Sequence, residues 1–427
     1  MGILRAAYLA HPGLPCGGPT LLLTFNKALV AYIRTLAAPE LRRVKVEHYH
    51  LFARGYLNHR GKMGPRSLLV GRDREAVIEE ACKAIAATHP STLFNRPLAF
   101  FEEELTWIAR HGVQSLDDYL AVNRAGRAEA RLERSARPIM WRVRDAYLNG
   151  RASAGLDYDL DDIASAVASE FVLDRTPRLY RHIVIDEGQD LSPEMLRSLA
   201  CAIPADGSLT FFGDVAQQIY GHRMSWRSAG LRPTKTWVFE ENYRNTREIA
   251  ALGLAVSQMP YYSGVPDMVA PKAPRAAGPK PTVVRLSDRQ SQLSFVSQQA
   301  SRLAETQSVA VLARTRNQLR EIRSALPRGA RSLNSSTFAL GAALHYGTLH
   351  SAKGLEFDVV ILPFMSATEL PDPAAIETYG AADAAANDGR LLYVGVTRAR
   401  RGLILCHDGD ATTLLPDEAS LYTRVIR

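Results

Sequence analysis

The sequence has few cysteines and no long apolar run, and these scarcities exclude several classes of protein. The 427 residues contain four scattered cysteines, Cys16, Cys82, Cys201 and Cys406. Because their spacing is unpaired, they argue against a disulfide framework and against a zinc site. No apolar run approaches the ~20 residues that span a bilayer, and residues 3–10 lack the cleavage region of a signal peptide. We therefore expect a cytoplasmic protein without a membrane partner.

The length and charge of the chain indicate its general class. A chain of 427 residues exceeds one typical core, so two or three domains are expected. A hydrophobic content of 46% with 22% charged residues is that of an ordinary soluble globular protein. The net charge of +8 favours a polyanionic partner, with nucleic acid as the first candidate and an anionic membrane surface as the second.

An apolar segment that ends in two carboxylates lies near the middle of the chain. Residues 182–185 include a β-branched run that indicates a buried strand of a parallel sheet, and Asp186 and Glu187 follow it. Catalytic groups of doubly wound α/β folds lie just past the carboxyl ends of strands. An Asp there can hold Mg²⁺, and the adjacent Glu can orient or deprotonate a water. The alternative is a solvated acidic turn.

Strand and helix candidates alternate along most of the chain. Apolar runs predict strands at residues 21–25, 44–46, 182–185, 208–212, 282–286, 309–313, 359–363 and 403–406. Helical patterns lie at residues 28–36, 195–202, 246–257, 292–305, 317–325 and 390–400. This alternation on both sides of a Pro-, Ala- and Gly-rich surface loop, residues 261–281, predicts two α/β units, each with a parallel sheet. Residues 368–388, acidic and alanine-rich, predict a solvated insertion.

The interval 54–168 is helical in character instead. Helices are predicted at residues 102–111 and 116–122, the second after the cap residue Ser115. One helix face carries Arg124, Arg127, Arg131 and Arg134, with Glu129 and Glu133 interleaved. This face is either a salt-bridged solvent face or a stripe that faces DNA. The acidic run 157–162 predicts a helix start.

Two of the predicted strands end in residues that suit nucleic-acid or phosphate binding. Residues 24–27, Thr-Phe-Asn-Lys at a strand-to-helix turn, could stack a base and grip a phosphate. The glycine-led exit at residues 213–220 contains Gln217, which could sense a phosphate or orient a water. For the aromatic residues in these stretches, core packing is the alternative.

Seven stretches, in chain order, resemble the motifs of the UvrD/Rep type of superfamily 1 helicases. They are residues 21–27 (motif Ia), 46–50 (Ib), D-E-G-Q-D at 186–190 (II), 213–220 (III), 242–244 (IV), 348–357 (V) and 393–400 (VI). The resemblance implies an α/β fold of two RecA-like lobes that close on ATP. Single-stranded DNA, or DNA with single-stranded tails, would run across both lobes. By this resemblance, residues 1–52 and 170–238 form lobe 1A, residues 53–169 a helical 1B insertion, and residues 239–427 lobe 2A.

The resemblance implies catalytic roles for five matching residues. Asp186 would coordinate Mg²⁺ and Glu187 would activate the attacking water. Gln217 would link the γ-phosphate of ATP to the DNA-sensing elements. Arg244 and Arg398 from the second lobe would act as arginine fingers that stabilise charge in the transition state.

The resemblance also implies binding roles and a direction of movement. Tyr243 would stack on adenine, and Glu356 would accept hydrogen bonds from the ribose hydroxyls. The implied DNA-binding residues are Phe25, Asn26, His50, Tyr220, Trp226, Thr348 and His350. The implied activity is ATP-dependent movement on DNA with 3′-to-5′ polarity.

The chain departs from the family because it contains no G-x-x-x-x-G-K-[ST] phosphate loop. The nearest Gly-Lys pair, Gly61-Lys62, lies downstream of residues 46–50 in a helical region. We hypothesise that Met1 is an internal methionine and that the loop was lost by truncation or by a misplaced start. The alternative is a degenerate helicase that acts as a non-hydrolysing DNA-binding or regulatory module, with a protein partner supplying the missing function.

A second departure is the short interval between Arg244 and Thr348. Larger members of the family carry a helical 2B insertion there, and this interval has no room for one beyond the strands and helices of the lobe itself. We therefore expect a compact motor of three parts whose unwinding is weaker than its translocation.

Overall fold

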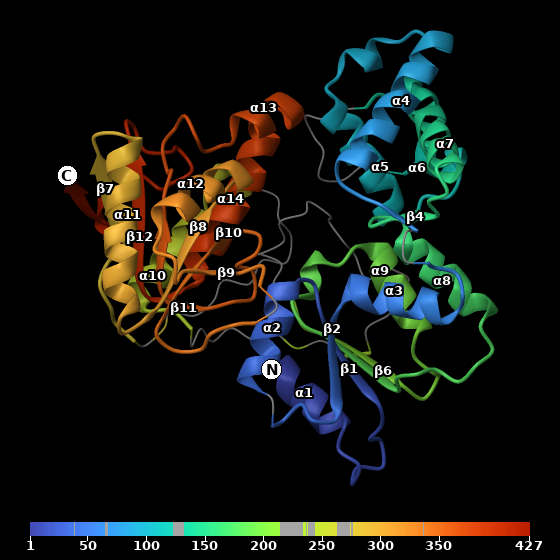
Figure 1. Cartoon of the computed structure of the whole chain (residues 1–427), viewed down its shortest axis with the longest axis horizontal. Helices are drawn as coiled ribbons and strands as arrows, with labels where there is room; N and C mark the ends of the chain where they lie inside the picture. The colour runs from blue at the N-terminus through green and yellow to red at the C-terminus, as the bar shows by residue number, and fades with distance from the viewer. Residues whose placement is uncertain are drawn as a thin grey trace.

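The computed structural model of the chain is an α/β architecture built on two parallel sheets (Figure 1). It describes residues 1–37, 39–64, 67–122, 132–213, 234–235, 237, 244–262, 274, 276–335 and 337–427. The first sheet has the strand order β2-β1-β5-β6, and the second has the order β13-β7-β12-β11-β8-β10-β9. Within the described residues every pair of neighbouring strands runs parallel, as predicted.

The first sheet and its helices combine segments that are far apart in the chain. Its strands are β1 Thr20–Thr24, β2 Val44–His48, β5 His182–Ile185 and β6 Ser208–Phe211. Its helices are α1 Gly2–Leu9, α2 Lys27–Leu36, α3 Tyr49–His59, α8 Ile163–Leu173 and α9 Pro193–Cys201. Leu22 and Val184 share a core with α1 and α2, whereas Leu21 and Ile183 share one with α3, α8 and α9. Both faces of β1 and β5 are therefore buried, which explains their continuous apolar sequences.

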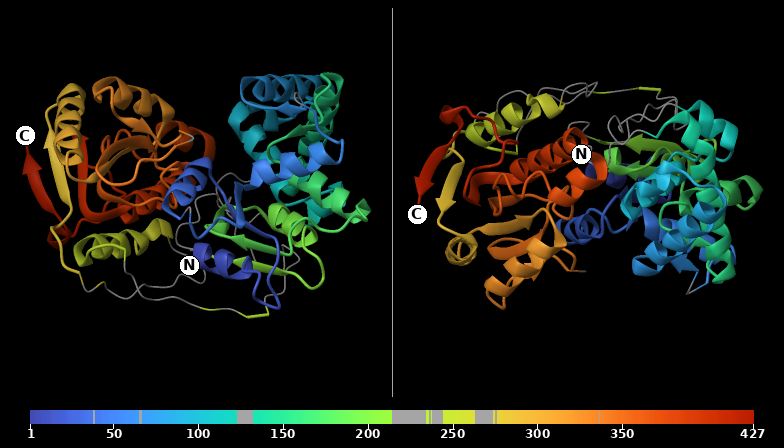
Figure 2. Two further views of the ribbon diagram at one scale, coloured as in Figure 1. Left: turned by 60° about the horizontal axis from the view of Figure 1, so that its bottom comes forward. Right: turned by 90° about the horizontal axis from the view of Figure 1, so that it is seen from above.

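A helical module with its own core is inserted between α3 and α8 (Figure 2). It consists of β3 Leu68–Leu69, α4 Arg72–Thr88, η1 Thr92–Asn95, α5 Leu98–Arg110, α6 Leu116–Ala121, η2 Arg134–Ala136, α7 Arg137–Ser153 and β4 Tyr158–Asp159. Phe100, Trp107 and Met140 lie in its core. The two helices predicted within this interval are confirmed as α5 and α6, and Ser115 Oγ accepts a hydrogen bond from Asp118 N at 3.1 Å. Of the arginine face, only Arg134 lies within the described residues.

The acidic run 157–162 leads into a helix, as predicted. The run forms β4 and a turn, and its last residue, Asp162, is the N-cap of α8, which begins at Ile163. Asp159 is buried and accepts hydrogen bonds from the backbone of Asp161 at 2.7 Å and of Asp162 at 2.9 Å. These bonds close a tight turn directly before α8, so Asp159 faces inward where the helix begins.

The second sheet carries the C-terminal half of the chain. Its strands are β7 Thr282–Leu286, β8 Ser308–Ala313, β9 Arg331–Ser332, β10 Ala343–Thr348, β11 Phe357–Leu362, β12 Ala399–Asp408 and β13 Thr423–Ile426. Its helices are α10 Arg247–Ser257, α11 Arg289–Ala304, α12 Arg316–Ala325, α13 Pro373–Tyr379 and α14 Ala381–Thr397. Between Arg244 and Thr348 the described residues form α10, a short 3-10 turn at Pro260–Tyr262, β7, α11, β8, α12, β9 and β10.

The prediction that residues 368–388 form a solvated insertion is wrong. They contain α13 and the first half of α14. Asp388 is fully buried, and its Oδ1 accepts a hydrogen bond from Arg314 Nε at 2.5 Å. Because this partner lies on the loop after β8, the acidic composition of the segment supports packing within the lobe.

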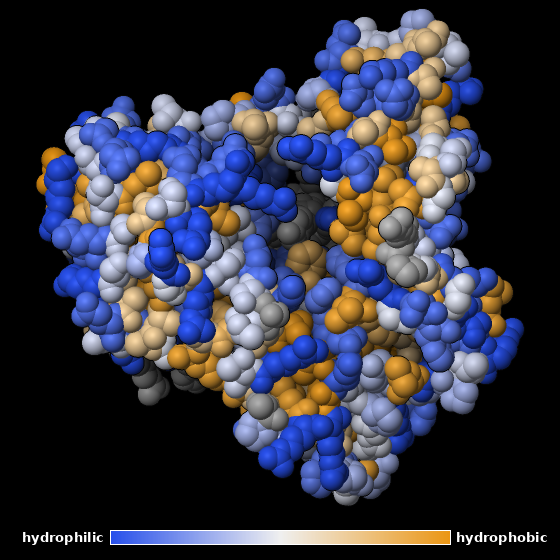
Figure 3. All heavy atoms as spheres, viewed as in Figure 1, coloured by the Kyte–Doolittle hydropathy of each residue, from blue (hydrophilic) through white to orange (hydrophobic). Residues whose placement is uncertain are grey.

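The two lobes meet along α2, and the second lobe also contacts the helical module. Leu29 of α2 belongs to the same core cluster as Ala352 and Leu355 of the second lobe. The rings of Tyr32 and Phe338 meet edge to face at 5.1 Å between centroids. Helix α13 touches α5, and the space-filling view shows a hollow between the second lobe and the helical module (Figure 3). In the described part of the chain, no helix combines the length and apolar character that a bilayer crossing requires.

Candidate functional site

Asp186 and Glu187 lie at the carboxyl end of β5, at the edge of the first sheet that faces the second lobe. Asp186 N donates to Leu23 O at 2.8 Å, and Gly188 N donates to Phe212 O at 2.9 Å. Glu187 between them has φ of 56°, a left-handed conformation that costs a non-glycine residue about 1–2 kcal/mol. Its Oε2 accepts from Gln189 Nε2 at 2.7 Å. The backbone and side chain of Glu187 are therefore both fixed by neighbouring bonds, which offset the strain.

The environment of Asp186 disfavours its negative charge. Burial and the adjacent Glu187 raise the pKa of Asp186 to about 6. Helix α1 begins directly opposite, because a Cβ added at Gly2 would lie 3.1 Å from Asp186 Cγ. Positive charge near the carboxylate would offset both causes, and Arg244 already acts in that direction.

The metal-binding capacity of this edge is limited to few protein oxygens. No group of three or more His, Cys, Asp or Glu side chains with metal-ligand geometry occurs among the residues that the structure describes. Mg²⁺ typically binds to proteins through one or two carboxylates, with waters and substrate phosphates completing its shell. The carboxylate of Asp186 fits this kind of site and would not fit a closed protein cage.

Arg244, predicted as an arginine finger, and Glu356, predicted to bind the ribose of ATP, form an ion pair in the second lobe. Arg244 Nε lies 2.5 Å from Glu356 Oε1, and each side chain is about one-third exposed. The positive charge of Arg244 also acts on Asp186 across the interface, where it opposes the rise of the Asp186 pKa. The structure therefore brings Arg244 and Glu356 together, close to the acidic edge of the first sheet.

Arg398 lies behind the surface that faces Glu187. Its side chain is fully buried, and its guanidinium donates to Val394 O at 3.1 Å and to Leu355 O at 3.3 Å. Gly354, the residue before Leu355, contacts the first lobe: a Cβ added there would lie 3.3 Å from Glu187 Cγ. Arg398 and Glu187 thus lie against adjacent residues of one loop. In this conformation the guanidinium is bonded within its own lobe.

Two predicted DNA-binding residues of the first lobe also support the fold. Asn26 caps α2, because its Oδ1 accepts from Leu29 N at 2.7 Å. Its Nδ2 donates to Lys353 O of the second lobe at 3.0 Å. Phe25 is partly buried and packs against the core shared with α8 and α9. Both residues therefore have structural contacts in addition to any contact with a ligand.

His50 lies at the junction of the first sheet and the helical module. Its Nε2 lies 3.2 Å from Leu160 O, and burial lowers its pKa below the usual range. The ring is half-buried, so it lies against the turn after β4.

Thr348 and His350 lie at the end of β10 in the second lobe. Thr348 Oγ1 accepts from Ser351 N at 3.2 Å and so closes the turn that follows the strand. Burial, together with the nearby Arg314 and Lys353, lowers the pKa of His350 to about 4. The ring is therefore neutral near pH 7. The remaining predicted residues Gln217, Tyr220, Trp226 and Tyr243 lie outside the described residues.

Two residues of this site were not singled out from the sequence. Lys353 Nζ lies 2.6 Å from Asp190 Oδ1, and the two side chains are 2% and 1% exposed. Asp190 ends the D-E-G-Q-D stretch, and Lys353 lies within residues 348–357. Each therefore belongs to a stretch that carried the resemblance, but no local pattern indicates that they pair across the lobes.

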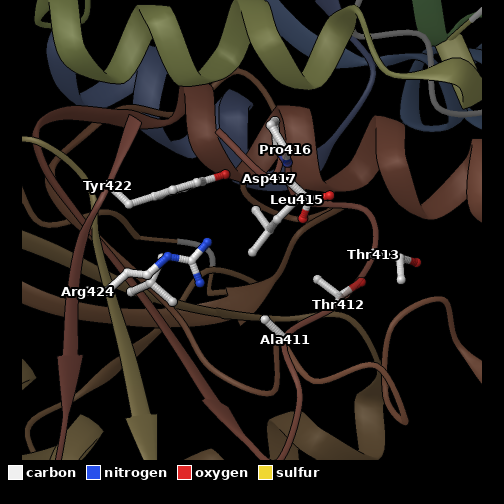
Figure 4. Close-up of a pocket in the computed structure, with 9 residues that line it drawn as sticks. Ala411, Thr412, Thr413, Leu415, Pro416, Asp417, Tyr422 and Arg424 are labelled. Atoms are coloured by element: carbon white, nitrogen blue, oxygen red, sulfur yellow. The ribbon is translucent and has the colours of Figure 1, made fainter. Parts of the chain in front are cut away.

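A small cavity elsewhere in the second lobe contains none of the predicted site residues. It has a volume of about 110 Å³ and lies between β13 and the loop after β12 (Figure 4). Tyr422, Arg424 and Asp417 contribute its polar groups. It is separate from the edge that carries Asp186 and Glu187.

Both halves of the chain match models of helicase domains. Residues 35–232 match the UvrD/REP helicase N-terminal domain, and residues 332–408 match the UvrD-like helicase C-terminal domain. The first match includes the acidic edge of the first sheet. The second includes the loop that contains Lys353 and Glu356.

Similar curated proteins are DNA helicase II proteins of Rickettsia. A probable DNA helicase II homolog of Rickettsia conorii and DNA helicase II of Rickettsia typhi are each 39% identical over 67 residues. These alignments cover 16% of this chain and about a tenth of the length of each relative. The crystal structure of the C-terminal domain of a possible DNA helicase from Lactobacillus plantarum WCFS1 is 22% identical, with a TM-score of 0.32. The alignment covers 43% of this chain and 98% of the chain in the Lactobacillus plantarum structure. That similarity is too low to bear on the fold.

Proposed function

We propose that this chain, which carries UvrD/REP-type N- and C-terminal helicase domains, is an ATP-dependent DNA helicase or translocase. It would couple ATP hydrolysis between its two lobes to movement on single-stranded DNA, in the 3′-to-5′ direction that the family resemblance implies. The observation that carries the proposal is geometric. A Cβ added at Gly354 of the second lobe would lie 3.3 Å from Glu187 Cγ, so the acidic edge faces the loop that carries Glu356, the ion-pair partner of Arg244.

The nucleotide side of the proposal assigns each residue a role that its environment supports. Asp186 would hold Mg²⁺, which supplies electrostatic stabilisation of phosphate charge. Glu187, fixed by Gln189, would accept the proton of the attacking water. Arg244 would stabilise charge on the transferred phosphoryl group. Glu356 would then release its ion pair with Arg244 and accept hydrogen bonds from the ribose hydroxyls of ATP. Arg398 would need the loop containing Leu355 to move before it reached the same phosphoryl group.

Three proposed roles concern residues outside the described part of the chain. Gln217 would link the γ-phosphate to the DNA side. Tyr243 would stack on adenine. Tyr220 and Trp226 would stack on bases, at about 1–3 kcal/mol for each base.

The DNA side of the proposal would use groups from both lobes. Phe25, Asn26 and His50 would serve from the first lobe, and Thr348 and His350 from the second. A neutral His350 ring near pH 7 suits stacking and hydrogen bonding more than phosphate pairing. The excess of Lys and Arg in the chain, 52 against 44 Asp and Glu, favours binding of the phosphate backbone.

A second candidate function is a DNA-binding or regulatory module that does not hydrolyse ATP. It is favoured by the absence of a G-x-x-x-x-G-K-[ST] loop from the 427 residues. That loop holds the β- and γ-phosphates through its amides and its lysine. A chain that binds single-stranded DNA without hydrolysing ATP would be a DNA-binding or regulatory module. A protein partner would then supply the hydrolysis.

The decisive experiment is an ATPase assay with and without a deoxythymidine oligonucleotide. It is run on this chain and on a version extended at its N-terminus in the reading frame. We expect DNA-stimulated hydrolysis by one or both, and a loss of at least about 100-fold in kcat for Glu187→Gln. The matched control is Glu79→Gln, which changes an exposed glutamate of the helical module and is expected to leave kcat unchanged.

Binding of the oligonucleotide to both versions is measured alongside hydrolysis, and the two results together decide between the two functions. Hydrolysis that depends on Glu187 supports the motor. DNA binding without hydrolysis by either version supports the binding module. If neither version binds the oligonucleotide, both proposals are contradicted.

A further inference from the structure

The contact between Asp190 and Lys353 joins the two lobes by a buried ion pair. The two residues are 163 positions apart, one in the turn after β5 and the other in the loop after β10. Their charged atoms lie 2.6 Å apart with almost no exposure to solvent. Removing one partner of such a pair leaves an uncompensated buried charge. The pair therefore stabilises the arrangement in which these two loops touch.

The Lys353 end of the pair is connected to residues on the proposed DNA side. Lys353 O accepts from Asn26 Nδ2 at 3.0 Å, and Lys353 N donates to His350 O at 3.4 Å. Asn26 in turn caps α2. A ligand that displaces Asn26 or His350 must therefore shift the backbone that carries Lys353.

The Asp190 end is connected to Glu187. Asp190 closes the short turn Gly188–Asp190, which begins at the left-handed Glu187. Gln189 of the same turn donates to Glu187 Oε2. A displacement of Asp190 therefore changes the position of the Glu187 carboxylate through three consecutive residues.

The pair is held less firmly than a saturated network would be. Asp190 Oδ2 is buried and has no hydrogen-bond partner among the described residues. An unsatisfied buried oxygen reduces the advantage of the closed arrangement. A modest change in the loop of Lys353 can therefore open the contact.

We infer that Lys353 and Asp190 are positioning residues that transmit the binding of single-stranded DNA at residues 26 and 348–350 to the carboxylate of Glu187. The inference rests on the proposed function, since it takes the ligand at residues 26 and 348–350 to be DNA. In this role Lys353 and Asp190 link the DNA-binding residues to Glu187. The neighbouring residues, and not this pair, contact the DNA or the nucleotide.

The test measures amide hydrogen exchange of residues 186–191 in the full chain, with and without a saturating deoxythymidine oligonucleotide. Leu191 N and Gly188 N are both hydrogen-bonded, so their exchange reports the opening of this turn. We expect the oligonucleotide to change exchange of these amides by at least about fivefold in the native chain. In Lys353→Met this response is expected to fall to less than about twofold, while the oligonucleotide still binds within about threefold of the native affinity.

Two further variants separate coupling from general damage to the fold. Lys353→Arg keeps the charge and is expected to retain part of the response. Lys83→Met removes an exposed lysine of the helical module and is expected to retain all of it. If Lys353→Met loses its folded melting transition, Asp190→Asn, which keeps the size of the side chain, replaces it in the same comparison.

The outcomes distinguish this inference from the proposed function. A native chain that binds the oligonucleotide without a change at residues 186–191 overturns the inference and leaves DNA binding intact. An undiminished response in Lys353→Met, or in Asp190→Asn where that variant is used, also overturns it. A native chain that does not bind the oligonucleotide overturns the proposed function and with it the inference.

Discussion

The interior of the helical module and the contact between the two lobes both contain buried ionic contacts, but these contacts are built differently. At the module, Asp159 accepts from Tyr147 Oη at 2.7 Å and from Arg74 Nε at 3.4 Å. Asp161 accepts from Arg110 Nε at 2.9 Å and from a threonine hydroxyl, also at 2.9 Å. Between the lobes, one lysine meets one aspartate, and one oxygen of that aspartate lacks a partner among the described residues.

This difference indicates which of the two ionic contacts is held more firmly. In the module, burial acts to raise the pKa of Asp159, but Arg74 and Tyr147 outweigh it and hold that pKa below its usual range. A carboxylate with several partners keeps its charge and its geometry. Between the lobes, the described residues give Asp190 one ion-pair partner, Lys353, and leave its Oδ2 without a hydrogen bond. We therefore expect the helical module to keep its internal arrangement more firmly than the loops of Asp190 and Lys353 keep theirs.

The largest effect is expected from breaking the module network with Asp159→Ala. The substitution leaves Arg74 and Arg151 without their shared buried carboxylate, which should destabilise the module by about 3–5 kcal/mol. Urea denaturation followed by tryptophan fluorescence measures this, because Trp107 is buried in the module core and Trp141 packs against it. The control Asp157→Ala removes an exposed carboxylate of the same run. A loss below about 1 kcal/mol for Asp159→Ala would show that the network does not hold the module.

A smaller and pH-dependent effect is expected at His345, a buried group of the second lobe whose Nε2 has no described partner. Burial lowers its pKa to about 4, from 6.5. Between pH 6.5 and pH 4 the unfolded chain therefore binds a proton that the folded chain does not, and stability falls as the pH falls. In His345→Phe the new ring would lie against Phe338, and this pH-dependent loss of stability disappears. The loss reaches about 3 kcal/mol in the free energy of unfolding at pH 4.

Hydrogen exchange of the β8 and β10 amides measures this difference in the lobe itself. The native chain should lose protection more steeply than His345→Phe as the pH is lowered from 6.5 to 4, after correction for the intrinsic exchange rate. At pH 8 the two curves should run parallel, because His345 is neutral in both the folded and the unfolded chain. Equal slopes at low pH would mean that His345 is protonated in the folded protein.

The smallest effect is expected where an ion pair is exposed. Lys83 lies 2.9 Å from Glu79 and 3.1 Å from Glu80 on the surface of α4. Solvent screening and side-chain entropy cancel most of the attraction in such pairs. Lys83→Gln should leave the urea midpoint of the module unchanged within error. A measurable loss would show that burial is not what separates the strong ionic contacts from the weak ones.

Much of the fold could be predicted because the buried strands are continuous apolar runs. The strands His182–Ile185 and Thr282–Leu286 occur with the predicted bounds. The short strands β9 and β13 at the ends of the second sheet were not predicted, since edge strands bury little and carry mixed residues. The acidic, alanine-rich segment was misread because the partner of Asp388, Arg314, lies 74 residues away.

The candidate site could be predicted only as a set of separate stretches. The carboxylates after β5 follow from the strand pattern, whereas the pairing of Asp190 with Lys353 joins residues 163 positions apart. Asn26 illustrates the opposite case. Its position at a strand-to-helix turn is typical of a helix cap, a role that was not predicted from the sequence and that the structure shows. Its proposed contact with DNA stays a prediction beside this structural role.

The claim that one DNA strand runs across both lobes is tested most directly by the affinity of the chain for a fluorescein-labelled deoxythymidine oligonucleotide. Fluorescence polarisation measures this affinity. Phe25→Ala tests the first lobe and His350→Ala the second. If DNA runs across both lobes, each variant should weaken binding at least about fivefold, and the two together should weaken it by about the product. Native affinity in His350→Ala, or no binding by the native chain, would contradict the claim that both lobes share one strand.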